Sequence, residues 1–583
     1  FTVYRLTSEQ YNLIHNTVIP TALNYWGEAL KVRRSEHIIR LNRKCRENQV
    51  FYKQESKHPF CKVSCEEDTM CGEVRVPNEH LESCRVCNAF GQNCGIVEDS
   101  KPGEGIRDAD FLFYISAMET ERCQKGMTVA YAAHCQQEAV LDRPIAGHAN
   151  LCPSSISLKA QELDILLSTV KHEMLHALGF SVSLFAFFRD SQGNPLTPRG
   201  DNGKPKLNEE LQTRQWSEQT IRKEVRSKFV RGGIYNKTVD VVVTPRVREE
   251  VQKHFGCSSI TGAELEDQGE EGTALTHWEK RLFENEAMTG THTQNPIYSR
   301  ITMALMEDTG WYLPNYEMAE ELKWGAGLGC DFALKSCKEW MDSRQRAGKS
   351  IHPYCNKVKR DPLETECTDD RSSVALCNLV NHGNELPPHL QNFDRIPHVN
   401  ISDVGYYGGS VGLADYCPYI QEFTWRSNNV VVRGSHCMYE ENQPSDERNF
   451  ALEKYGEGAK CFDHSKDMWE ERSCGQVRQW QHWGSGCYAY SCSEGRLNIK
   501  VMNKTFTCFK KNQELTVKLL SESWLHTGSL VCPACQDICN KETCLPDIEP
   551  PRFYQYPRHE LTCGAFNLIS STFLIILALG AIF

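Results

Sequence analysis

The stretch KHEMLHALGFS, residues 171–181, decides the fold. It carries His172, Glu173 and His176 in the spacing H-E-x-x-H. On a helix, residues four apart lie on one face, so both imidazoles can reach one ion. Glu173 is rotated by about 100° from His172, so its carboxylate can lie beside that ion without binding it. The pattern therefore predicts a catalytic zinc site of the kind that hydrolyses peptide bonds.

A catalytic zinc ion needs a third protein ligand and keeps one open position. In the compact long form of this motif the third histidine follows six residues after the second, but Val182 stands there. The candidates further along the chain are His254, His277, His292, Glu284 and Glu286. His254 lies within a charged insertion, and the chemistry of the residues alone leaves the other candidates open.

The segments before the motif predict a sheet followed by a helix. Residues 110–117, 128–133 and 144–152 are strand-like runs. Residues 158–178 carry a broad apolar stripe at helical spacing, and we expect Gly179 to end this helix in the left-handed conformation. Residues 1–50 have helical spacing that is interrupted at Pro20. The fold class is therefore α+β, with a mixed sheet and an active-site helix.

The rest of the chain divides by composition. Residues 189–272 are polar and charged and are expected to form an insertion, partly strand-forming at 239–245. Cysteines become dense again beyond Cys330. We expect four parts: a catalytic subdomain (1–180), a central subdomain with the insertion and the third ligand (181–328), a cysteine-rich domain (329–560), and a hydrophobic terminal segment (564–583).

Composition indicates an oxidising compartment. The 583 residues include 28 cysteines, an even number that is typical of disulfide-bonded secreted or lumenal proteins. The C-x-x-C pairs Cys84/Cys87 and Cys532/Cys535 are expected to be disulfide-bonded rather than metal-binding. Glycosylation sequons stand at Asn236, Asn400 and Asn503. The net charge of −11, without a dense basic run, argues against nucleic acid binding.

The carboxyl-terminal stretch GAFNLISSTFLIILALGAIF, residues 564–583, is apolar and uncharged. About twenty such residues are just enough to cross a bilayer as a helix. The same stretch fits a GPI-attachment signal, with the small triplet Cys563-Gly564-Ala565 before the apolar run. We therefore expect membrane attachment through this segment, either as a transmembrane helix or by a GPI anchor.

Four stretches together resemble a known family: HEMLHALGFS, THWEKRLFENEAM, ALMEDTGWY and KWGAGLGCDF. In combination they are similar to the leishmanolysin family of metzincin-type zinc metallopeptidases, most closely to its leishmanolysin-like branch in animals. The resemblance implies that the third ligand is His277, after an insertion of about 100 residues. It also implies that Met288 forms the Met-turn, an apolar floor beneath the zinc. Glu284 and Glu286 would then be a solvated helical face.

The function implied is that of a zinc endopeptidase. One zinc ion, held by His172, His176 and His277, would lower the pKa of its water and polarise the scissile carbonyl. Glu173 would accept the proton of the water and pass it to the leaving amine. The resemblance to metzincins implies that the strand around 145–151 pairs with an extended substrate. The rival hypothesis is a catalytically silent cell-surface adhesion or scaffold protein, which would predict loss of Glu173 or of the ligands.

Overall fold

The computed structural model describes residues 2–563 apart from 4–5, 36–37, 54–55, 125–127, 270–271, 292–294, 361, 428–429 and 480–481. Contacts divide the chain into two compact units. The first comprises Phe1–Asn356 and Leu379–Tyr419, and the second comprises Lys357–Asn378 and Ile420–Phe583. The boundary expected at residue 329 from composition lies inside the first unit.

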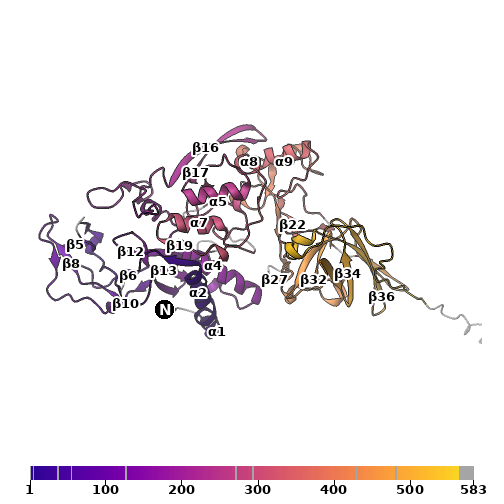
Figure 1. Cartoon of the computed structure of the whole chain (residues 1–583), viewed down its shortest axis with the longest axis horizontal. Helices are drawn as coiled ribbons and strands as arrows, with labels where there is room; N and C mark the ends of the chain where they lie inside the picture. The colour runs from indigo at the N-terminus through magenta and orange to yellow at the C-terminus, as the bar shows by residue number, and fades with distance from the viewer. Residues whose placement is uncertain are drawn as a thin grey trace, which may run out of the picture. The chain divides into compact units, whose positions relative to one another are not determined.

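A four-stranded sheet organises the first unit (Figure 1). Its strands are β1 (Thr2–Val3), β11 (Leu112–Ala117), β13 (Pro144–Leu151) and β12 (Ala130–Gln137), in that spatial order. The first three are parallel to one another, and β12 is antiparallel to β13. The three strand-like runs predicted before the motif are therefore strands of one mixed sheet.

The interior position of β13 corrects one expectation. The stretch 145–151 was expected to pair with substrate, but β13 is hydrogen-bonded to β11 on one side and to β12 on the other. Its backbone groups are already used, so it has no free edge to offer. The free edge on this side of the sheet belongs to β12.

The helix α4 (Ala160–Leu178) follows β13 and packs against β12 and β13. Gly179 ends it, but with φ of 179° rather than in the left-handed conformation that we expected. The reason for glycine is the close approach of another helix. A Cβ at this position would lie 3.1 Å from Met306 Cε of α7 (Arg300–Asp308) and 3.3 Å from Thr309 Cγ2.

The amino-terminal helical prediction holds for part of its length. The segments α1 (Ser8–Leu13), a π turn (Ile14–Val18) and α2 (Ile19–Ala29) form one continuous helix, which is not broken at Pro20. The extra residue of a π turn accommodates a proline that cannot donate its N–H. Beyond Ala29 the chain is extended, and β2 (Leu30–Val32) pairs with β19 (Tyr312–Pro314).

The charged insertion is an ordered part of the first unit. It contains a long hairpin of β16 (Ile221–Val230) and β17 (Gly233–Val242), then α5 (Pro245–Phe255), which packs against α7. The short strand β18 (Ala263–Glu264) returns to pair with β17. After it come α6 (Lys280–Phe283), α7, α8 (Cys330–Leu334) and α9 (Cys337–Arg346).

The second unit contains two four-stranded antiparallel sheets (Figure 1). One has the order β28 (Ala459–Asp463), β32 (Ser485–Ser493), β33 (Arg496–Val501) and β34 (Lys504–Cys508). The other has the order β30 (Val477–Gln479), β29 (Glu470–Arg472), β36 (Trp524–Val531) and β35 (Glu514–Ser521). Inward side chains such as Phe462, Tyr488, Ile499 and Val517 form a common core.

The cysteines of the described chain are all disulfide-bonded. Neither C-x-x-C pair closes on itself or binds metal. Cys84 pairs with Cys65 and Cys87 with Cys94, while Cys532 pairs with Cys508 and Cys535 with Cys544. In the part of the chain that the structure describes, no helix is both long and apolar enough to cross a membrane. The segment 564–583, expected to be an anchor, lies outside the described residues.

Candidate metal centre

Two of the candidate ligands lie on the last two turns of α4. His172 and His176 are four residues apart, so their rings project from one face of the helix. The carbonyl of Lys171, the residue before His172, accepts a hydrogen bond from Trp26 Nε1 of α2 at 3.0 Å. The helix is therefore fixed by the sheet on one side and by α2 on another.

His277 arrives from the segment between β18 and α6. Its carbonyl accepts a hydrogen bond from the Glu266 N–H at 2.9 Å, directly after β18. The next residue, Trp278, is fully buried, and its N–H donates to the Met288 carbonyl at 2.9 Å. β18 pairs with β17 at the end of the insertion, and the residues that follow β18 bring His277 back beside α4.

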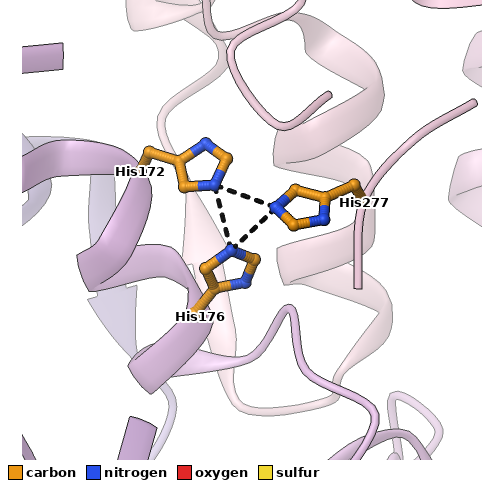
Figure 2. A group of neighbouring side chains, drawn as sticks. All are labelled: His172, His176 and His277. Atoms are coloured by element: carbon orange, nitrogen blue, oxygen red, sulfur yellow. Dashed lines mark hydrogen bonds between the residues drawn. The ribbon is translucent and has the colours of Figure 1, made fainter. Parts of the chain in front are cut away.

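The three imidazoles point toward one another (Figure 2). The Nε2 atoms of His172 and His176 are 3.0 Å apart, and His277 Nε2 lies 3.2 Å from the first and 3.3 Å from the second. Figure 2 shows the two helical rings on one side and His277 facing them from another segment.

The opposite ring nitrogens fix the tautomer of each histidine. Nδ1 of His172 lies 2.6 Å from the Ala287 carbonyl, that of His176 lies 2.7 Å from the Phe180 carbonyl, and that of His277 lies 2.9 Å from the Thr273 carbonyl. A carbonyl only accepts, so each Nδ1 carries the proton. Each neutral ring therefore directs the lone pair of Nε2 into the shared centre.

Burial keeps these rings neutral. Desolvation, with a smaller contribution from the neighbouring imidazoles, lowers the pKa of His172 well below its usual range. Desolvation lowers the pKa of His176 to about 4 and that of His277 to about 3. Neutral imidazole is the form that binds a metal ion.

The donor set fits zinc. A tetrahedral ion with Zn–N bonds of about 2.0–2.1 Å holds its nitrogens about 3.3–3.4 Å apart, close to the observed 3.0–3.3 Å. Three lone pairs so close together repel one another unless a cation lies between them. Carbonyl acceptors on the outer nitrogens are the usual second layer of a histidine zinc site.

Glu173 lies beside this centre on α4. The backbone N–H of Ala132 on β12 lies near its carboxylate and favours the charged form. Desolvation raises the pKa of Glu173 to about 8, against the opposing effects of the Ala132 amide and of Arg122. The carboxylate therefore lies between α4 and the free edge of the sheet, and its pKa is higher than that of an exposed carboxylate.

A family model described as Leishmanolysin matches residues 47–544. The chain belongs to the leishmanolysin family. It is 61% identical to the leishmanolysin-like peptidase of Drosophila melanogaster, over the whole of this chain and 86% of that protein. It is 46% identical to the leishmanolysin-like peptidase of Caenorhabditis elegans, over 98% of this chain and 87% of that protein. The leishmanolysin of Leishmania donovani is 27% identical, over 72% of this chain and 53% of its own length.

Membership in the leishmanolysin family makes the chain a zinc metallopeptidase, as the sequence motifs predicted. Its mixed helix and sheet content and many disulfides agree with that family.

The other candidate ligands lie elsewhere in this leishmanolysin-family chain. His254 is on α5, where its Nε2 contacts the Trp324 carbonyl at 2.9 Å. Glu284 pairs with Lys280 at 2.8 Å. His292 lies outside the described residues. Within the described part of the chain, the metal-binding group around His172 contains none of these residues.

Glu286 is not part of a solvated face, as we had expected. It is fully buried, and its carboxylate accepts hydrogen bonds from the N–H of Met288, from the N–H and hydroxyl of Ser299, and from the hydroxyl of Thr302. These bonds attach the turn that carries Ala287 and Met288 to the start of α7. Glu286 thus supports the carbonyl that orients His172.

Sequence reasoning missed the backbone partners of the site. The carbonyls of Ala287, Phe180 and Thr273 and the amide of Ala132 carry no signal in their side chains. One of them could have been found: Phe180 follows His176 by four residues at a helix end, where carbonyls and side chains of the last turn meet. The other three depend on contacts that are distant in sequence.

Proposed function

We propose that this chain is a zinc endopeptidase in which His172, His176 and His277 hold the metal and Glu173 is the general base. One observation carries the proposal. Three Nε2 atoms lie within 3.0–3.3 Å of one another, and each ring has its other nitrogen bonded to a backbone carbonyl. Such a set of aligned lone pairs serves a cation and has no other evident partner.

The chemistry divides between the metal and Glu173. Zinc, when bound, supplies a Lewis acid and makes water a better nucleophile near neutral pH. Glu173 accepts a proton from the attacking water and delivers it to the leaving amine. Burial raises the pKa of Glu173, so its carboxylate holds the proton that it takes from the water more strongly than an exposed carboxylate would.

We assign substrate pairing to β12. The Val129 carbonyl accepts a hydrogen bond from the Cys152 N–H on the β13 side, and neighbouring residues of a strand alternate in direction. Ala130, Ala132 and His134 therefore turn their backbone groups to the free edge. An extended peptide can add to such an edge by main-chain hydrogen bonds.

Met288 is proposed as the apolar floor of the site. It is fully buried, and it follows Ala287, whose carbonyl binds His172 Nδ1. Its own carbonyl accepts the N–H of Trp278, the residue after His277. The turn at Met288 is thus hydrogen-bonded to His172 through the Ala287 carbonyl, and to Trp278, the residue that follows His277.

The proposed location is the secretory pathway, with attachment to the cell surface or another membrane through residues 564–583. The disulfides support an oxidising compartment. Asn236, Asn400 and Asn503 are all exposed, as glycan attachment requires.

The proposal is tested by metal analysis and turnover of the purified full chain. We expect about one zinc ion per chain. Hydrolysis of an internally quenched peptide should disappear on chelation and return with added zinc. A protein that is folded and holds zinc but cleaves no peptide would support the silent adhesion protein instead.

A further inference from the structure

The face of β12 that lies away from α4 carries Tyr131. Gly147 of β13 approaches Ala177 of α4, so Gly147 and its cross-strand partner His134 face the helix. Side chains alternate along a strand, so Ala132 and Ala130 share the helix side and Tyr131 lies on the other. There the Tyr131 hydroxyl donates to Glu73 at 2.6 Å.

Arg122 is held over the ring of Tyr131. Its guanidinium carbon lies 5.0 Å from the ring centroid, within the range of a cation–π contact. It stands on α3 (Glu121–Gln124), and the next residue, Cys123, is tied by a disulfide to Cys152 at the end of β13. The backbone beneath Arg122 is therefore anchored to the sheet, beside the free edge.

The charge of Arg122 is not neutralised within the described residues. Its side chain is exposed, and no carboxylate of the described chain lies within ion-pair distance. Glu73, which lies beside the Tyr131 hydroxyl, is engaged by that hydroxyl and by His148 Nδ1 at 3.5 Å. The chain as a whole has a net charge of −11, so the exposed guanidinium of Arg122 gives this end of β12 a local charge of the opposite sign.

We propose that Arg122 determines specificity, by selecting substrates with an acidic side chain on the carboxyl-terminal side of the scissile bond. This inference rests on the proposed endopeptidase function. Antiparallel pairing is the more stable ladder, and a substrate antiparallel to β12 runs toward its carboxyl terminus from Ala132 toward Ala130. The substrate residue opposite Tyr131 then presents its side chain on the Tyr131 face, within cross-strand reach of the ring and of the guanidinium.

The expected preference is modest because Arg122 is exposed. A solvent-exposed ion pair favours the acidic substrate by about two- to fivefold in kcat/KM. A guanidinium can bind a carboxylate through two parallel N–H donors, and its position over Tyr131 reduces the freedom it loses on binding. The preference should weaken as salt is raised, since exposed charges are screened.

The test uses the full zinc-loaded chain and matched quenched peptides. Glu or Gln is placed in turn at each of the three positions on either side of the cleaved bond, and kcat/KM is measured for each peptide. We expect a Glu-to-Gln ratio of about two to five at one position on the carboxyl-terminal side. Arg122→Glu should invert that ratio, Arg122→Gln should bring it to about one, and Arg122→Lys should keep its sign.

Lys206→Glu is the matched control. Lys206 is also an exposed cation, but it follows Lys204, which contacts Asp142 at the β12–β13 turn, the opposite end of the edge strand. This variant has the same change in net charge and should keep the wild-type ratio.

Two results would overturn the inference. In one, the wild type cleaves all peptides but shows a ratio of one at every position, or a ratio that Arg122→Glu does not change. In the other, the preference lies on the amino-terminal side, which would mean a different substrate direction. If the wild type cleaves none of the peptides, the proposed function fails, and the inference fails with it. Failure of Arg122→Glu to fold leaves the decision to Arg122→Gln and to the salt dependence of the wild-type ratio.

Discussion

Replacement of Glu286 by Gln tests whether this residue supports the site or binds the metal. The wild-type carboxylate accepts hydrogen bonds from Met288, Ser299 and Thr302 and is fully buried. A glutamine keeps one oxygen for Ser299 and Thr302 but turns an amide donor toward the Met288 N–H. Leaving one buried N–H unpaired costs about 1–3 kcal/mol.

At high pH the ionisation of Glu286 destabilises the wild type, and this loss offsets the cost of the glutamine in the comparison of the two proteins. Desolvation raises the pKa of Glu286 to about 7 in the folded protein, from the ordinary 4.5 of an exposed carboxyl group. Because the folded state holds this proton more tightly, the wild type loses stability as pH rises through the folded pKa. Between about pH 5.5 and about pH 8 this loss is about 2 kcal/mol, and a glutamine does not share it.

The expected result is therefore a change in Tm that depends on pH. Glu286→Gln should lower the Tm clearly at about pH 5.5 and have little effect, or a small stabilising one, at about pH 8. Zinc content should equal that of the wild type at about pH 8, because the carboxylate faces Met288, Ser299 and Thr302. Thermal unfolding of the zinc-loaded protein and metal analysis measure both quantities. Glu317→Gln, at an exposed position, is the control.

Two outcomes would refute this reasoning. An equal change in Tm at both pH values would mean that Glu286 does not carry the raised pKa. A folded Glu286→Gln protein without zinc, together with a His277→Ala protein that keeps its zinc, would make Glu286 the third ligand. The chain would then hold its metal by a different plan from the one proposed.

The remaining predictions concern the metal, the base and the membrane segment. His277→Ala should lose zinc and activity together, whereas His254→Ala should keep both; metal analysis of the purified variants decides this. Glu173→Gln should lower kcat by roughly 10²–10⁴-fold with zinc retained, and loss of zinc would instead give Glu173 a structural role. Zinc should stay bound as pH falls through 6.5, because burial keeps the ligand imidazoles neutral there; loss of zinc near pH 6.5 would contradict the lowered pKa of His176. A chain ending before Gly564 should appear in the culture medium, and release of the full chain by a phosphatidylinositol-specific phospholipase would distinguish a GPI anchor from a helix.

Local patterns in the sequence predicted the local part of the site well. Helical periodicity over 158–178 and the strand-like runs before it depend on neighbouring residues, and the structure has α4, β11, β12 and β13 there. The end of α4 was harder. Glycine at position 179 suggested a left-handed residue, but its purpose is contact with Met306, more than a hundred residues away in the sequence.

The third histidine could not be chosen from the chemistry of the residues alone. His277 differs from His254 by its place after β18, and that strand is defined only by pairing with β17. The pairing brings the Glu266 amide to the His277 carbonyl. Only the resemblance to a known family singled out His277 in the sequence, because a return across about 100 residues leaves no local pattern.

The edge strand of the sheet was one of the expectations that failed, and it determines which strand can pair with a substrate. The runs TVAYAA and PIAGHANL are both small and apolar, so nothing in either sequence shows which has a second partner. The parallel partner of β13 is β11, which comes earlier in the chain, and this pairing leaves β12 outermost. Because β12 runs opposite to β13, the direction of an antiparallel substrate is also reversed from the one that β13 would impose. A substrate on β12 passes Tyr131 and Arg122 after the reacting centre. The position of preferred acidic residues in cleaved peptides therefore tests the strand assignment as well as the role of Arg122.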